Sequence, residues 1–194
     1  EASGTVAPAQ SGNTIVFSGD LGRYDDPTMV DPVGFDRTDY LVVESTYGDR
    51  RHSSVDPEAV LGEIVERTIG RGGTVVMPAF AVGRTQSLLF HLAQLKDKGR
   101  IGNVPIFLDS PMAQDASDIF CDGAGEHRLT EAACRHACAV ARYVRSVEES
   151  KALMTNPMPK VIVSASGMAT GGRVLHHLKQ YAPDPRNTIL FAGF

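Results

Sequence analysis

Cysteine is scarce in this sequence of 194 residues, and long apolar runs are missing from it. The three cysteines, Cys121, Cys134 and Cys138, form no Cys-x-x-Cys pair and no even-numbered framework, and no zinc finger is visible. This cysteine usage favours a reducing cytoplasm. No stretch reaches the length of about 18 apolar residues that a membrane span needs, and no signal-peptide pattern is present. We therefore expect a cytoplasmic protein without a membrane partner.

Positive charge is also in deficit, because 19 Lys and Arg residues face 23 Asp and Glu residues and the formal net charge is -4 at pH 7. This balance argues against a chain that holds nucleic acid through a broadly basic surface. A polyanion partner is not excluded, but it must bind at local basic side chains or backbone sites. The content of 42% hydrophobic and 22% charged residues is that of a globular protein and argues against disorder.

Short apolar stretches alternate with amphipathic ones along most of the chain, which predicts α/β units around a largely parallel sheet. The helix over 57–70 has the clearest start, since Asp56 suits the N-cap and Pro57 the first helical position. The segments 122–129 and 155–159 are predicted loops. Strands are expected near 13–17, 40–44, 74–78, 104–108, 160–164 and 188–192, and helices near 57–70, 85–97, 115–121, 130–142 and 173–181.

Five of the expected strands end in segments rich in glycine, hydroxyl or carboxylate groups. Ligands of open α/β sheets collect beyond the carboxyl ends of the strands, because loops and helix N-termini converge there. Turn chemistry explains any one of these segments, but five together favour a binding site. They are SGDLG (18–22), ESTYG (44–48), PAFAVGR (78–84), DSPMA (109–113) and SASGMATGGR (164–173).

Two of these segments place Gly-Arg at the start of an expected helix, at Arg84 and at Arg173. A cation in the first helical turn opposes the helix dipole, so an anion such as phosphate held beside it is one explanation. Pairing with a local carboxylate such as Asp109 is the other. The segment 164–173 lacks both the GK[ST] ending of a P-loop and the GxGxxG spacing of a dinucleotide site, so neither ATP nor NAD is expected.

A resemblance to the β-CASP branch of the metallo-β-lactamase superfamily is carried, in order, by VFSGDLGR, LVVESTYGDR, GGTVVMPAFAVGRTQSLLFHL, IFLDSPMA and VIVSASGMATGGRVLHHL, with DPRNTILFAGF after them. The likeness covers nearly the whole chain from Ser18 on. That branch contains RNA-processing nucleases, among them relatives of the cleavage-and-polyadenylation endonuclease. It implies part of a metallo-β-lactamase αββα domain over 1–48 and an inserted β-CASP domain over 49–194, with a mainly parallel sheet flanked by helices.

The resemblance also implies roles for two acids that, taken alone, would be turn or cap residues. Asp20 looks like the catalytic carboxylate that bridges two zinc ions, and Glu44 looks like the acid that orients a histidine serving as general acid. Two such ions, about 3.5–4 Å apart, hold a hydroxide and a phosphoryl oxygen together for in-line attack. Substrate-binding residues are expected at Arg84, Ser110, Ser166, Gly167, Met168 and Arg173.

Four histidine motifs of the family are absent from this sequence, and none of its six histidines stands in a matching context. We therefore expect the chain to be a piece of a zinc-dependent ribonuclease. Alone it is expected to bind zinc weakly or not at all and to leave RNA uncut. His176 and His177 are expected to pack or to contact substrate, and Cys134 and Cys138 to pack.

Two alternatives stay open. One is a non-catalytic RNA-binding or scaffold subunit that has lost metal ligands, and the other is a nuclease of the same branch that acts on DNA. The presence of Asp20 and Glu44 favours catalysis, and the segment 164–173 is closer to the RNA-processing members. The expected partner is single-stranded RNA. The oligomeric state, with a homodimer as one alternative, and the choice between internal and 5′-end cleavage are left open.

Overall fold

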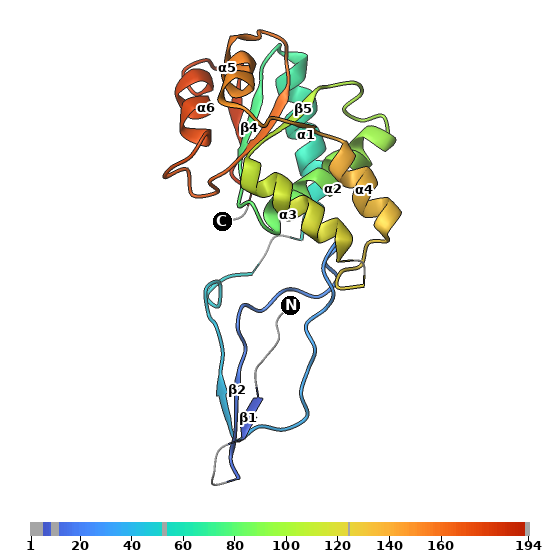
Figure 1. Ribbon diagram of the computed structural model, residues 1–194, viewed down its shortest axis with the longest axis vertical. Coiled ribbons are helices and arrows are strands. Elements are labelled where there is room, and N and C mark those ends of the chain that lie inside the picture. The colour runs from blue at the N-terminus through green and yellow to red at the C-terminus, as the bar shows by residue number, and fades with distance from the viewer. Residues whose placement is uncertain (1–5, 9–11, 52–53, 124, 193–194) are drawn as a thin grey trace. The chain divides into compact units, whose positions relative to one another are not determined.

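The structure is a computed structural model that describes residues 6–8, 12–51, 54–123 and 125–192 (Figure 1). The chain divides into two compact units, of which the first contains Glu1–Ser54 with Gly125–Arg128 and the second contains Val55–Ala124 with Leu129–Phe194. None of the helices described has both the length and the apolar character needed to cross a bilayer. The assignment of residues 1–48 to a metallo-β-lactamase domain stays a prediction.

The first unit is built on a three-stranded sheet of β1 (Val6–Pro8), β2 (Thr14–Phe17) and β3 (Tyr40–Val42). β2 pairs with β1 in antiparallel fashion and with β3 in parallel. The sequence predicts β2 and β3 but misses β1. Because β2 and β3 run parallel, the segments that follow them leave the sheet at the same edge, where the Ser18 N–H donates to the Val42 carbonyl oxygen at 2.9 Å.

The second unit contains a five-stranded sheet in the order β6-β5-β7-β4-β8, and every pairing in it is parallel. The predicted α/β class with a mainly parallel sheet is thereby confirmed. The central strands are buried on both faces, which is why their sequences are nearly continuous apolar runs. The strands are β4 (Val75–Pro78), β5 (Ile106–Asp109), β6 (Arg142–Tyr143), β7 (Val161–Ser164) and β8 (Thr188–Ile189).

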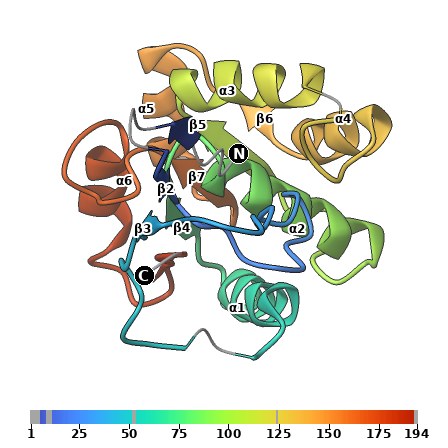
Figure 2. The same ribbon diagram turned by 90° about the horizontal axis from the view of Figure 1, so that it is seen from below.

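Helices cover both faces of this sheet (Figures 1 and 2). Side chains alternate between the faces along β4, so Val75 and Met77 join the larger core while Val76 joins the smaller one. On the larger side lie α1 (Pro57–Gly70), α2 (Arg84–Asp97), α3 (Pro111–Asp122) and α4 (Glu131–Ala139), and on the other side lie α5 (Val147–Thr155) and α6 (Val174–Tyr181).

Helix starts follow from capping residues. Asp56 caps α1, as expected, by accepting from the Glu58 N–H at 3.0 Å. α5 is missing from the sequence prediction, although its signal is present. Its first turn is a capping box, in which the Ser146 hydroxyl accepts from the Glu149 N–H at 3.1 Å and the Glu149 carboxylate accepts from the Ser146 N–H at 3.0 Å.

Two further expectations need correction. The helix expected over 130–142 ends at Ala139, and its last expected residue, Arg142, belongs to β6. The cysteines do more than pack, because Cys121 near the end of α3 forms a disulfide with Cys134 of α4. Both are buried, as packing requires, but the covalent link between the two helices was not expected from the sequence.

Candidate functional site

The carboxyl ends of β4, β5 and β7 lie side by side, because these strands are neighbours in the sheet. Pro78 is in register with Ser164, and Ser164 with Asp109. The Ala79 N–H donates to the Ser164 carbonyl oxygen at 3.0 Å, and the Ser164 hydroxyl donates to the Asp109 carbonyl oxygen at 3.0 Å. The structure thus brings together the three segments PAFAVGR, DSPMA and SASGMATGGR.

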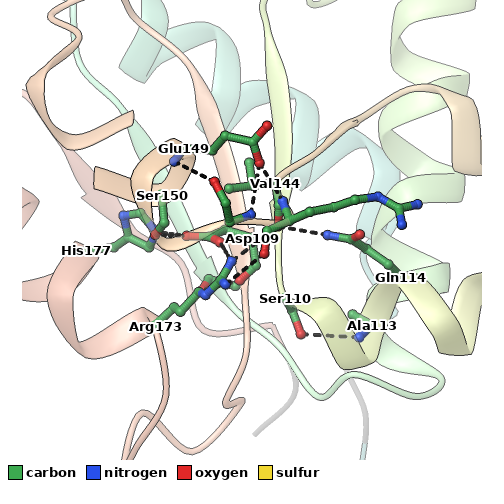
Figure 3. A network of polar contacts seen from close by, with 12 residues as sticks. Asp109, Ser110, Ala113, Gln114, Val144, Glu149, Ser150, Arg173 and His177 are labelled. Carbon is green, nitrogen blue, oxygen red and sulfur yellow. Dashed lines mark hydrogen bonds and ion pairs between the residues drawn. The ribbon is translucent and has the colours of Figure 1, made fainter. Parts of the chain in front are cut away.

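Asp109, at the end of β5, is the centre of a buried polar network (Figure 3). Its Oδ1 atom accepts from Arg173 Nη1 at 2.7 Å. Its Oδ2 atom lies 2.7 Å from His177 Nε2 and also accepts from the Ser150 hydroxyl. One carboxylate therefore ties β5 to α5 and to both the start and the middle of α6.

The network keeps the Asp109 carboxyl ionised. Burial on its own raises the pKa of this group, but the hydrogen bonds from His177, Ser150 and Arg173 outweigh burial and hold the pKa below its ordinary value of 3.8. His177 is fully buried, so the expectation that it packs is confirmed. The sequence predicts neither its partner nor the role of Ser150.

For Arg173 the sequence leaves two partners open, a bound anion such as phosphate or a local carboxylate such as Asp109. Besides Asp109, its guanidinium donates to the carbonyl oxygens of Val144 at 3.2 Å and Arg145 at 3.0 Å. The side chain is 22% exposed. The structure supports pairing with Asp109, so this charge is largely used inside the fold, and a direct contact of Arg173 with RNA stays a prediction.

Arg84 has the contrasting environment. It is the first residue of α2 and is exposed, and it has no ion-pair partner among the residues that the structure describes. Gly83 before it has a φ of 75°, a left-handed conformation that glycine adopts without strain, and provides no side-chain cap. An exposed, unpaired guanidinium at the carboxyl edge of the sheet is available to an anion.

The other expected substrate-binding residues are placed in different ways. Met168 is exposed and Ser166 is half-buried, whereas Ser110 and Gly167 are buried. The Ser110 hydroxyl caps α3 by accepting from the Ala113 N–H at 3.2 Å, and a contact of Ser110 with substrate stays a prediction. Gly167 packs against the ring and backbone of Phe80, where a Cβ atom would lie 2.8 Å from Phe80 Cδ2 and 2.9 Å from Phe80 N.

Asp20 and Glu44 belong to the first unit. Asp20 is exposed in the segment after β2, and Glu44 is half-buried after β3. The Glu44 N–H donates to the Ser18 hydroxyl at 3.0 Å, which ties the two segments together. The Glu44 carboxylate accepts from the Thr46 N–H at 2.8 Å, and this hydrogen bond lowers the pKa of Glu44.

The described residues do not by themselves fit a two-zinc centre. Asp20 is the expected ligand, but within the part of the chain that the structure describes it belongs to no group of three or more close His, Cys, Asp or Glu side chains. A zinc ion takes four ligands, so one exposed carboxylate does not fix it. The one such group among the described residues consists of Cys121, Cys134 and Cys138.

Comparison with known proteins gives the family. Residues 85–194 match the family model of the Beta-Casp domain. The chain is 37% identical over 197 residues to ribonuclease TTHA0252 of Thermus thermophilus, an alignment that covers 97% of this chain and 45% of that protein. It is 34% identical over 194 residues to transcription termination factor FttA of Methanosarcina mazei, covering 94% and 30%.

Endoribonuclease ysh1 of Schizosaccharomyces pombe is 33% identical over 189 residues, with coverage of 95% of this chain and 25% of the relative. The chain thus spans less than half the length of each of these three relatives. The family match covers more than half of the chain and, apart from residues 125–128, lies within the unit that carries the parallel sheet. The chain therefore belongs to the Beta-Casp family, the β-CASP branch of the metallo-β-lactamase superfamily.

Proposed function

We propose that this chain is part of a zinc-dependent ribonuclease, which hydrolyses RNA phosphodiester bonds in RNA processing or decay. The observation that carries the proposal is the convergence of the segments PAFAVGR, DSPMA and SASGMATGGR at the carboxyl edge of β4, β5 and β7. Two similar proteins are named ribonuclease and endoribonuclease. Because the chain spans less than half of their length, the activity is proposed for a protein that adds further metal ligands to this chain.

The second unit is proposed to hold the RNA backbone at this edge. Arg84 supplies an exposed guanidinium that can contact a phosphate oxygen, a contact that positions RNA without reading its sequence. Phe80, with half of its surface exposed, lies against Gly167, and the residue after Gly167 in the sequence is the exposed Met168. Exposed aromatic and apolar side chains accept unstacked bases, which supports single-stranded RNA as the substrate.

Two zinc ions are the proposed cofactor, with Asp20 as one ligand. When bound, such ions supply a water that is deprotonated near neutral pH. Glu44 is proposed to orient an imidazole through its carboxylate, because a carboxylate that accepts from a histidine N–H fixes the ring. The lowered pKa of Glu44 keeps this acceptor ionised at neutral pH. A cytoplasmic location and a homodimer stay predictions.

The test is a cleavage assay on the protein that contains this chain together with its remaining metal ligands. It is incubated with zinc and end-labelled single-stranded RNA. Asp20→Ala is expected to lower the cleavage rate by about 100-fold or more through loss of metal. Asp36→Ala is the matched control, since Asp36 is an exposed carboxylate of the same unit, and it should cut at the wild-type rate.

Other outcomes of this assay would contradict the proposal or favour one of the two alternatives. Equal cleavage by wild type and Asp20→Ala would contradict the role of Asp20. Binding of RNA without cleavage by either protein would favour the scaffold alternative, and faster cleavage of a DNA strand of the same sequence would favour the DNA-directed alternative. The product lengths separate internal cleavage from cleavage at the 5′ end.

A further inference from the structure

Three sulfur atoms come together where α3 meets α4. Cys121 lies in the last turn of α3, and Cys134 and Cys138 lie one turn apart on the same face of α4. Cys121 and Cys134 form the disulfide, and the Cys138 sulfur lies 3.4 Å from that of Cys121. All three sulfurs lie within 4.8 Å of one another. A third cysteine in contact with a disulfide is not needed for the covalent link.

These separations resemble those within a metal site. A tetrahedral zinc ion has Zn–S bonds of about 2.3 Å, so two of its sulfur ligands lie about 3.8 Å apart. The sulfurs of Cys121 and Cys138 are already near that separation. Reduction of the disulfide lets the sulfurs of Cys121 and Cys134 move apart to a similar distance, which side-chain rotation on two packed helices allows.

One carboxylate and two guanidinium groups line a cavity beside these cysteines. A cavity of about 250 Å³ adjoins Cys121 and Cys138, and its lining also includes Asp118, Arg135, Tyr143 and Arg145. Asp118 lies one turn before Cys121 on α3, so its carboxylate is on the same side of that helix. Three thiolates and one carboxylate exceed the charge of a zinc ion by two. The Arg145 guanidinium, which lines the same cavity, offsets part of this excess, while Arg135 also pairs with Glu131 and Asp122.

We propose that Cys121, Cys134 and Cys138, when reduced, form a zinc site that Asp118 completes. Two molecules of a thiol reductant convert the disulfide to two protein thiols and leave as one disulfide. Zn²⁺ then replaces the protons of the three thiols, so three protons are released for each ion bound. The oxidised chain has one thiol left at this place and does not hold the ion.

The site uses none of the residues proposed for RNA or for the nuclease centre. It revises the expectation that this chain binds zinc weakly or not at all, because that expectation rested on the family's histidine motifs. A zinc ion here would fix the last turn of α3 to the middle of α4 in the reduced protein, as the disulfide does in the oxidised protein. The zinc ion and the disulfide are thus alternative cross-links between α3 and α4.

The test compares the reduced and oxidised forms of the 194-residue chain. After reduction with a phosphine, which is then removed, Co²⁺ is titrated as a spectroscopic probe and displaced by Zn²⁺. The reduced chain is expected to bind one ion and to show sulfur-to-cobalt charge-transfer bands, whereas the oxidised chain should show none. In the wild-type chain, Zn²⁺ should protect all three cysteines from alkylation, a readout that needs no variant.

Variants assign the ligands. Cys138→Ser should lose the charge-transfer bands characteristic of three thiolates, and Asp118→Asn should keep them with an affinity about 10-fold lower. Asp115→Asn, an exposed acid on the same helix, is the matched control and should bind as wild type does. The proposal is overturned if the reduced wild-type chain binds no more Zn²⁺ than a chain with all three cysteines changed to serine, or if Zn²⁺ leaves alkylation unchanged.

Discussion

Asp109 and Arg173, 64 residues apart in the chain, form an ion pair with 2.7 Å between Oδ1 and Nη1. Asp109 is the last residue of β5 and is fully buried. Arg173 directly precedes α6, and its guanidinium also donates to two carbonyl oxygens. The pair therefore fixes the strand-end segment 109–113 against the segment 164–173. The order of the proposed RNA-binding edge depends on this buried contact.

Removal of the carboxylate should destabilise the protein strongly. Asp109→Ala leaves the buried His177 and Ser150 without this acceptor and removes the ion-pair partner of Arg173, and we expect the free energy of unfolding to fall by about 3–5 kcal/mol. Urea unfolding followed by circular dichroism measures this change. Asp115→Ala removes an exposed carboxylate from α3 and should stay within about 0.5 kcal/mol of wild type. A loss below 1 kcal/mol for Asp109→Ala would contradict the network.

The same carboxylate should make stability depend on acid pH. Its pKa is lower in the folded protein than the ordinary 3.8, so the unfolded chain takes up the proton first as pH falls. The stabilisation is complete above about pH 5 and is lost as pH falls through the folded pKa. Unfolding free energies of wild type and Asp109→Asn, measured from pH 2 to 6, should differ most at pH 6, and the difference should shrink as pH falls below 3.8 toward the lower folded pKa. A difference that grows toward acid pH would contradict a folded pKa of Asp109 below its unfolded value.

Gly167 should tolerate no side chain. A Cβ atom there would meet the Phe80 ring and backbone nitrogen below 3.0 Å, and the backbone cannot yield as a flexible side chain can. We expect Gly167→Ala to lower the unfolding free energy by about 1–3 kcal/mol. Gly171→Ala is the control within the same segment, because no atom lies within 4 Å of a Cβ at that position. Equal melting temperatures for the two variants would show that the segment does not pack on Phe80.

The parallel sheet could be predicted because its central strands are buried on both faces and so have continuous apolar sequences. β6 could not, since a two-residue strand that begins with an exposed arginine carries no apolar pattern. α5 could have been found from Ser146 and Glu149, whose spacing matches a capping box.

The candidate site was predictable in its segments but not in its contacts. The Gly-Arg pattern is the same at Arg84 and Arg173, yet one guanidinium is exposed and the other is paired with Asp109. The difference arises because β5 lies beside β7 in the sheet, which places Asp109 next to the start of α6. Such a neighbour relation is a tertiary property, and neither helix start encodes it locally. The meeting of Cys121 with Cys134 and Cys138 has the same origin in the packing of α3 on α4.

The most direct test of the central claim is the affinity of this chain for a labelled single-stranded RNA, measured as a function of salt for wild type, Arg84→Ala and Arg67→Ala. Arg67 is an exposed arginine in the last turn of α1, which leads into the amino end of β4, so it serves as the matched control. We predict that Arg84→Ala weakens binding about 10-fold and lowers the slope of log affinity against log salt by about 1, while its melting temperature and the affinity of Arg67→Ala stay unchanged. Equal affinities and equal salt slopes for all three proteins would contradict the claim that the carboxyl edge of this sheet holds the RNA backbone.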